Sequence, residues 1–195
     1  MKPVAFDYER PADLASAAAL ARREDTMVKF IAGGQSLGPM LNLRLVQPDL
    51  LVDLTGLAEL KRVEVTAEAL IVGACVTHAD IEDGRVPEIG GGVLRALAAG
   101  IAYRAVRNRG TIGGSICHAD PAADWVACLC ALGASVVITD GSQRRVVAIW
   151  LRRSAFRVCR PARAGAFTRC AARPASSARQ SAPSCMIPYA RCAAP

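Results

Sequence analysis

The sequence has 195 residues, 52% of them apolar, and a net charge of +7, which suits one domain or two small subdomains around a shared cleft. Its opening segment, MKPVAFDYERPADL, is charged and lacks the apolar stretch of a secretory signal. No run reaches the roughly 20 apolar residues that a membrane span needs. We therefore expect a cytoplasmic protein without a membrane span.

The positive charge lies at the end of the sequence. Residues 151–195 contain nine Arg and no Lys, Asp or Glu, so this segment carries +9 and residues 1–150 carry −2. A basic segment can bind nucleic acid, but these Arg lack helical spacing. We therefore expect no nucleic-acid partner.

Cysteine and histidine do not form a metal motif. No pair of Cys has C-x-x-C spacing, and His78 and His118 are not spaced as zinc ligands. The Cys spacings also exclude an iron–sulfur cluster built by this chain alone. The Cys residues before position 150 stand among Ala, Val and Leu, which favours buried, reduced thiols.

The first part of the chain reads as a small α/β unit. The pattern predicts helices over residues 12–23 and 36–45 and short apolar strands over residues 28–32 and 50–54. A helix between successive strands indicates a parallel pair. We therefore expect residues 1–56 to form an N-terminal subdomain.

The second part mixes strands and helices without strict alternation, which is typical of an α+β arrangement. We expect it to form a second subdomain over residues 57–150, and its predicted strands and helices are as follows. The strands cover residues 60–65, 69–74 and 135–139, and the helices cover residues 78–82, 92–99 and 122–132.

The pattern stops after residue 149. Residues 151–195 have no sustained period of 2 or 3.6 and few large apolar side chains, so we expect a basic, disordered tail. The simultaneous loss of Lys, Asp and Glu also fits translation out of frame after about codon 150, which is the interpretation that we favour. The alternative is a native basic extension.

Two glycine pairs stand at places where backbone N–H groups can converge on an anion. The first follows a predicted strand, and the second follows Arg107 and Arg109 and precedes a predicted helix. Neither is G-x-G-x-x-G or a nucleotide triphosphate loop. The two segments are Ala32, Gly33, Gly34, Gln35 and Ser36, and Thr111, Ile112, Gly113, Gly114 and Ser115. A single such pair is more often a simple turn, but two of them fit a ligand with two phosphates.

Three strings carry a family resemblance: FDYERPADLASA, KFIAGGQSLGPMLNLRLVQPDLLVDL and AYRAVRNRGTIGGSICHADPAADW. Over about residues 1–149 the sequence resembles the FAD-binding, or medium, subunit of the carbon monoxide dehydrogenase and xanthine dehydrogenase family. The resemblance implies an α+β fold with two subdomains, the FAD-binding domain of the p-cresol methylhydroxylase type. The C-terminal part of that domain has no counterpart in the sequence after residue 150, so we expect an incomplete domain.

The resemblance also implies a role for each segment. The two glycine segments would hold the FAD pyrophosphate through backbone N–H and hydroxyl donors, and Asp124 would contact the flavin nucleotide. No side chain is expected to be catalytic or to bind a metal, because the flavin carries the redox chemistry.

The implied function is that of an oxidoreductase subunit. Its FAD would pass electrons from iron–sulfur clusters to an acceptor, and its partners would be a molybdenum-cofactor large subunit and a 2Fe-2S small subunit. Two alternatives stay open: a truncated product without function, and a stand-alone flavin-binding module. The sequence does not identify the substrate of the complex.

Overall fold

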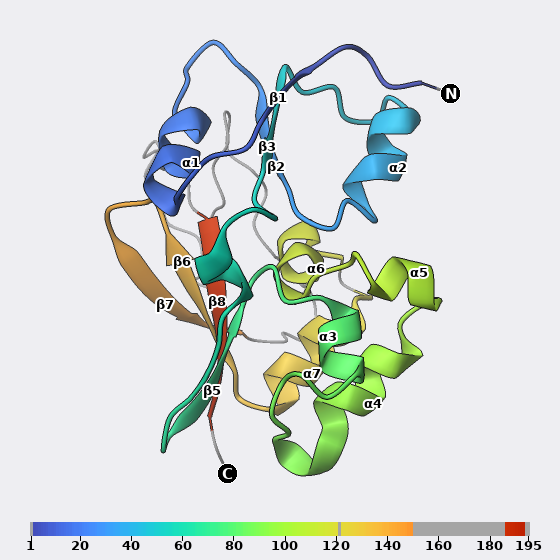
Figure 1. Ribbon diagram of the computed structural model, residues 1–195, viewed down its shortest axis with the longest axis vertical. Helices are drawn as coiled ribbons and strands as arrows, with labels where there is room; N and C mark the ends of the chain where they lie inside the picture. The colour runs from blue at the N-terminus through green and yellow to red at the C-terminus, as the bar shows by residue number, and fades with distance from the viewer. Residues whose placement is uncertain (1, 121, 150–185, 194–195) are drawn as a thin grey trace, which may run out of the picture.

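The computed structural model describes residues 2–120, 122–149 and 186–193, which form two sheets and a group of helices (Figure 1). A small three-stranded sheet lies at the top of the view. A five-stranded sheet lies below it, with most of the helices to its right. This mixture of parallel and antiparallel sheets with separate helices confirms the α+β class.

The small sheet is parallel, with the order β1-β3-β2. Its strands are β1 (Asp7–Glu9), β2 (Val28–Ile31) and β3 (Leu50–Asp53), and its helices are α1 (Leu14–Ala21) and α2 (Leu37–Asn42). Every residue of β3 is buried, as expected for the central strand of a parallel sheet. The carboxylate of Asp13 caps α1 by accepting the N–H of Ser16 at 2.7 Å. The parallel pairing of β2 and β3 is confirmed, whereas β1 was not predicted.

The large sheet is antiparallel throughout, with the order β4-β5-β8-β6-β7. Its strands are β4 (Val63–Val65), β5 (Ala69–Gly73), β6 (Ser135–Thr139), β7 (Arg144–Ala148) and β8 (Met186–Ala193). The predicted strand at 60–65 is only partly right, because residues Ala58–Lys61 form the 3₁₀ turn η1 before β4 begins.

Strand β8 corrects the expectation of a disordered tail. Met186–Ala193 pairs with β5 on one side and with β6 on the other, so it is the central strand of the sheet. The sequence of this strand has only a weak β pattern, but its backbone is paired on both sides. Without β8, the facing edges of β5 and β6 would be left unpaired. Residues 150–185, 194 and 195 lie outside the described residues. For that part of the tail, disorder and the frame interpretation stay predictions.

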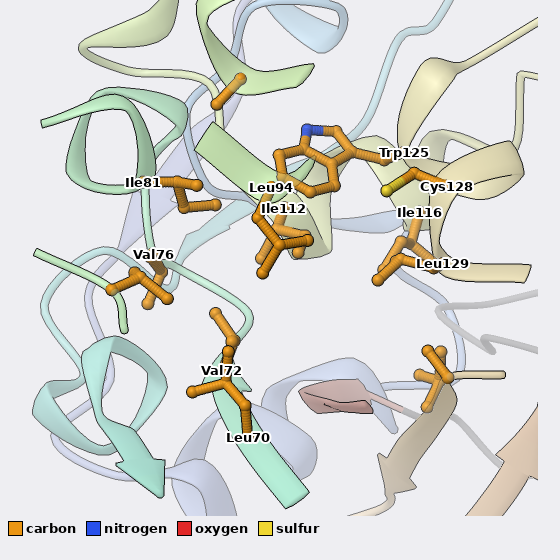
Figure 2. Packing of buried hydrophobic residues seen from close by; sticks show 14 of the residues in the cluster. Leu70, Val72, Val76, Ile81, Leu94, Ile112, Ile116, Trp125, Cys128 and Leu129 are labelled. Carbon is orange, nitrogen blue, oxygen red and sulfur yellow. The ribbon is translucent and has the colours of Figure 1, made fainter. Parts of the chain in front are cut away.

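The helices of the second part lie around one apolar cluster, and all but the one over Arg104–Arg107 bury side chains in it. They are α3 (His78–Glu82), α4 (Val93–Gly100), α5 (Arg104–Arg107), α6 (Ile112–His118) and α7 (Asp124–Ala131), with the 3₁₀ turn η2 (Gly90–Gly92) before α4. Figure 2 shows Trp125, Leu94, Ile112 and Leu129 close together in this cluster. Trp125 is only 1% exposed, so α7 is anchored in the core through the first turn of its own helix.

A second cluster holds the small sheet to the rest of the molecule. It contains Leu14, Val28, Leu50 and Val52 from the small sheet and α1, and it continues to Ala74 and Cys75 just after β5. The contact between the two halves is therefore apolar and buried. The boundary expected at residues 56 and 57 stays a prediction.

Candidate functional site

The first glycine segment joins the end of β2 to the start of α2. Gly34 has φ of 69°, a left-handed conformation that glycine adopts without strain. Within the described part of the chain, the N–H groups of residues 34–37 have no hydrogen-bond acceptor. Ser36 is exposed and its hydroxyl does not cap the helix. Consecutive N–H groups without an acceptor among the described residues, next to the start of a helix, can bind an anion.

The second glycine segment lies directly against the first. A Cβ on Gly33 would lie 1.9 Å from the carbonyl oxygen of Arg109 and 2.8 Å from the Cα of Gly110. Only a residue without a side chain allows this approach. The tertiary structure therefore brings the two predicted segments together, although about 75 positions separate them in the sequence.

The second segment differs from the expected loop. Gly113 and Gly114 lie in the first turn of α6, and the hydroxyl of Thr111 caps that helix by accepting the N–H of Gly114 at 3.0 Å. The N–H groups of Ile112, Gly113 and Ser115 donate to main-chain carbonyls of the protein. The N–H groups of residues 112–115 are therefore used within the protein, whereas that of Thr111 has no acceptor among the described residues. The role of this segment in holding FAD stays a prediction. The hydroxyls of Thr111 and Ser115 donate no hydrogen bond to any described residue, so both could donate to a ligand.

The reason for these internal bonds is a short antiparallel contact with the segment after β5. The N–H of His78 donates to Gly110 at 2.9 Å, that of Ile112 to Val76 at 3.1 Å, and that of Gly113 to Ala74 at 3.0 Å. A Cβ on Gly113 would lie 2.5 Å from the Cβ of Ala74. Gly113 is thus needed for close packing of two chain segments, and the side chain of Ile112 is buried in the core.

The two arginines before this segment have different roles. Arg107 makes a two-pronged ion pair with Glu82, with nitrogen–oxygen distances of 2.7 and 3.0 Å, and donates to the carbonyl of Ala102 at 2.9 Å. The hydrogen bond from Arg107 is the main reason that the pKa of Glu82 lies below its ordinary value. Arg107 therefore holds α5 to α3 and is not available to a ligand.

Arg109 is the available positive charge. Its side chain is exposed and makes no ion pair or hydrogen bond with any described residue. Its main chain contacts Gly33, as described above, and its charge acts on the phenol of Tyr8. The main chain of Arg109 thus adjoins the first segment at Gly33, and its exposed side chain extends from that point.

A polar group at the carboxyl edge of the small sheet was not predicted from the sequence. Asp53, at the end of β3, is 7% exposed; it accepts a short hydrogen bond from the Tyr8 hydroxyl and pairs with Arg10 at 3.3 Å. Burial alone would raise the pKa of Asp53, but the hydrogen bonds from Tyr8 and Thr55 and the charge of Arg10 outweigh it and lower the pKa. Carboxyl edges of parallel strands are common ligand sites. An Asp at the end of an apolar run was the signal that could have identified this position.

A buried pair of aromatic rings was also missed. The indole N–H of Trp125 donates to Nδ1 of His78 at 3.1 Å, and the ring centroids are 5.8 Å apart. Burial, with a further contribution from the charge of Arg107, lowers the pKa of His78 to about 4. His78 is therefore neutral at physiological pH.

Asp124 begins α7, and no hydrogen bond joins its side chain to either glycine segment among the described residues. It is exposed and lines a cavity of about 480 Å³ between α4 and α7, whose other walls include Val93, Leu97, Gly100 and Leu132. No residue of either glycine segment lines this cavity. The role of Asp124 in binding the flavin nucleotide stays a prediction.

The cysteines agree with the expectation of reduced thiols where they are buried. Cys75 and Cys128 are buried and free, and burial raises the pKa of Cys75 to about 12. Among the residues that the structure describes, no group of His, Cys, Asp and Glu could hold a metal ion. In the same part of the chain, none of the helices combines the length and the apolar composition needed to cross a membrane.

Comparison with known proteins decides the family. Residues 4–160 match the family described as FAD binding domain in molybdopterin dehydrogenase. The chain belongs to this family. The match runs beyond residue 149, where the resemblance was expected to end. FAD is therefore the cofactor of this domain, and the exposed Arg109 and the free N–H groups of the first segment fit its pyrophosphate.

The curated relatives are longer than this chain. It is 38% identical over 137 residues to caffeine dehydrogenase subunit beta of Pseudomonas sp. (strain CBB1), which covers 70% of the chain and 46% of that protein. It is 35% identical over 147 residues to the carbon monoxide dehydrogenase medium chain of Hydrogenophaga pseudoflava, which covers 75% of the chain and 51% of that protein. The chain thus spans about half the length of these relatives.

Solved structures share the fold. Quinoline 2-oxidoreductase from Pseudomonas putida 86 is 32% identical and superposes with a TM-score of 0.80, covering 100% of this chain and 61% of that one. Carbon monoxide dehydrogenase from Hydrogenophaga pseudoflava is 29% identical with the same TM-score and the same coverage. These likenesses confirm the expected fold, the FAD-binding domain of the p-cresol methylhydroxylase type.

Proposed function

We propose that this chain is the FAD-binding part of an oxidoreductase of the molybdenum-hydroxylase type. Its partners are a large subunit with the molybdenum cofactor and a small subunit with 2Fe-2S clusters. Electrons pass from those clusters through FAD to an acceptor. The support is family membership together with the names of the relatives, which are subunits of dehydrogenases. A cytoplasmic location is part of the same proposal.

One observation indicates which residues form the FAD site. The N–H groups of Gly34, Gln35 and Ser36 have no acceptor in the described part of the chain, and Arg109 is held beside them by the contact between Arg109 and Gly33. A pyrophosphate bound there would accept hydrogen bonds from the N–H groups, which strengthen when the acceptor is charged. The guanidinium of Arg109 would supply the positive charge.

The chain's own residues bind and orient the cofactor. When bound, FAD supplies the exchange of electrons, and the protein supplies position and electrostatics. The free N–H groups hold the phosphates, Ser36 and Ser115 add hydroxyl donors at the two segments, and Arg109 balances the negative charge. No proton transfer by a side chain of this chain is required.

The test is a titration of the purified chain with FAD, followed by the fluorescence of the flavin. We expect Arg109→Ala to weaken binding about tenfold, and more at low salt, because a charged contact to phosphate is lost. The control is Arg144→Ala, which removes another exposed arginine on β7, at the far edge of the large sheet. Equal affinity of the wild type and Arg109→Ala would remove Arg109 from the site.

The same titration, together with co-purification, also distinguishes the two alternatives, a truncated product without function and a stand-alone flavin-binding module. A purified chain that binds no FAD at any concentration would support a product without function. A chain that binds FAD but never co-purifies with molybdenum and iron–sulfur subunits would support a stand-alone flavin-binding module.

A further inference from the structure

His78 packs against Gly110, the residue just before the second glycine segment. Its main-chain N–H donates to the carbonyl of Gly110 at 2.9 Å. Its imidazole faces the same residue, because a Cβ on Gly110 would lie 2.8 Å from Cδ2 and 2.9 Å from Nε2 of the ring. The ring is 5% exposed, so it forms a buried wall against which Gly110 rests.

Trp125 fixes the orientation of that wall. The indole N–H donates to Nδ1 of His78 at 3.1 Å, and the two rings are stacked with an interplanar angle of 27°. A neutral imidazole that accepts at Nδ1 carries its proton on Nε2, so the bond selects one tautomer and one ring orientation. Since Trp125 is anchored in the large core cluster (Figure 2), the imidazole is tied to the buried core of the domain.

The contacts continue to the first glycine segment. Gly110 rests on His78, and the main chain of Arg109 and Gly110 lies against Gly33. A shift of the imidazole would therefore move Arg109 relative to the N–H groups of residues 34–37. No side chain of this series other than that of Arg109 needs to touch the cofactor.

We propose that His78 is a positioning residue of the FAD site: its imidazole, oriented by Trp125, sets the spacing between the two glycine segments. The proposal rests on the proposed function, because it concerns the same cofactor. The low pKa of His78 agrees with it, since only the neutral ring can accept the indole N–H. Arg107 is the charged group whose field acts on the ring, and it opposes protonation in the same direction as burial.

The experiment measures the dissociation constant of FAD by flavin fluorescence for the full 195-residue chain and three variants. His78→Leu removes the acceptor and leaves a buried indole N–H unpaired, so we expect binding about tenfold weaker. His78→Asn places an amide oxygen near the position of Nδ1, so we expect it to restore most of the affinity. Leu70→Ala loosens the same core cluster on β5, away from Trp125 (Figure 2), so we expect a lower melting temperature with unchanged affinity.

Each outcome decides the proposal. Unchanged FAD affinity in His78→Leu, or an equal loss in Leu70→Ala, would overturn it, because the effect would then be absent or due to a general loosening of the core. If His78→Leu does not fold, Trp125→Phe keeps an aromatic ring in the core and removes the N–H donor, and it is expected to weaken FAD binding. A wild-type chain that binds no FAD would instead contradict the proposed function, which separates the two failures.

Discussion

Gly33 and Arg109 meet main chain to main chain, with the carbonyl oxygen of Arg109 only 1.9 Å from the place that a Cβ on Gly33 would occupy. This contact joins the small parallel sheet to the segment that begins α6. It sets the main chain of Arg109, whose side chain is exposed, against the segment in which the N–H groups of residues 34–37 have no acceptor among the described residues. The candidate FAD site exists because two distant parts of the chain approach without a side chain between them.

The first prediction tests this contact. We expect Gly33→Ala to lower the free energy of unfolding by about 3 kcal/mol or more, because the added methyl overlaps a backbone atom that cannot move freely. Its FAD affinity should fall as well. The control is Gly38→Ala in α2, where a Cβ meets nothing within 4 Å, and which should be neutral or stabilising by about 0.5 kcal/mol. Urea unfolding of the three proteins gives the comparison, and a neutral Gly33→Ala would contradict the contact.

The second prediction separates the two glycine pairs. Gly34→Val places a branched side chain at a φ of 69°, in the segment whose backbone is proposed to bind the anion. We expect the main effect to be a loss of FAD affinity, with a smaller fall in the melting temperature. Gly114→Val places a Cβ 2.8 Å from the hydroxyl of Thr111, which caps α6, so the cost should be about 1 kcal/mol of stability. Melting temperature and FAD affinity are measured for both. The reverse order of the two effects would mean that the second segment is the anion site.

The third prediction concerns the ion pair between Glu82 and Arg107. Glu82→Gln keeps the shape of the side chain and removes its charge, so the link between α3 and α5 should weaken and the melting temperature should fall. Because the pKa of Glu82 is lowered in the folded state, the pair stabilises above the ordinary pKa of Glu and this stabilisation is lost as the pH falls below it. The difference between wild type and Glu82→Gln should therefore shrink in acid. A constant difference across pH would show that the charge does not matter.

The fourth prediction concerns how the free energy of unfolding depends on pH through His78. Its pKa falls from 6.5 to about 4 on folding, so between these values the unfolded chain binds the proton and the folded chain does not. Stability should therefore be constant above pH 6.5 and should fall as the pH drops toward 4, by about 3 kcal/mol in total. Thermal unfolding from pH 7.5 to 4.5 measures the slope. His78→Phe should lack this part of the slope, and an unchanged profile in that variant would show that another group causes it.

Local signals predicted much of the fold. The strand at residues 135–139, the helix at residues 78–82 and the parallel pairing of β2 with β3 were predicted from apolar spacing, and Asp13 was expected near the start of α1. These elements depend on neighbours in the sequence, through caps and periodic burial. Strand β8 has no such local signal, because its place is set by β5 and β6 on either side.

The sequence by itself determined the family and the two segments that carry glycine pairs, because the residues of each motif are consecutive in the chain. Only the tertiary structure decided how those glycines are used. Gly33, Gly110 and Gly113 allow close packing of main chain and ring, whereas Gly34 has a left-handed φ and an N–H without an acceptor among the described residues. The distinction between Arg107 and Arg109 was likewise invisible in the sequence, since both are basic residues beside the same motif. Glu82, 25 positions before Arg107, forms an ion pair with the Arg107 guanidinium, whereas the Arg109 side chain stays exposed. Ion pairing depends on distance in space and not along the chain, so the sequence could not show this difference.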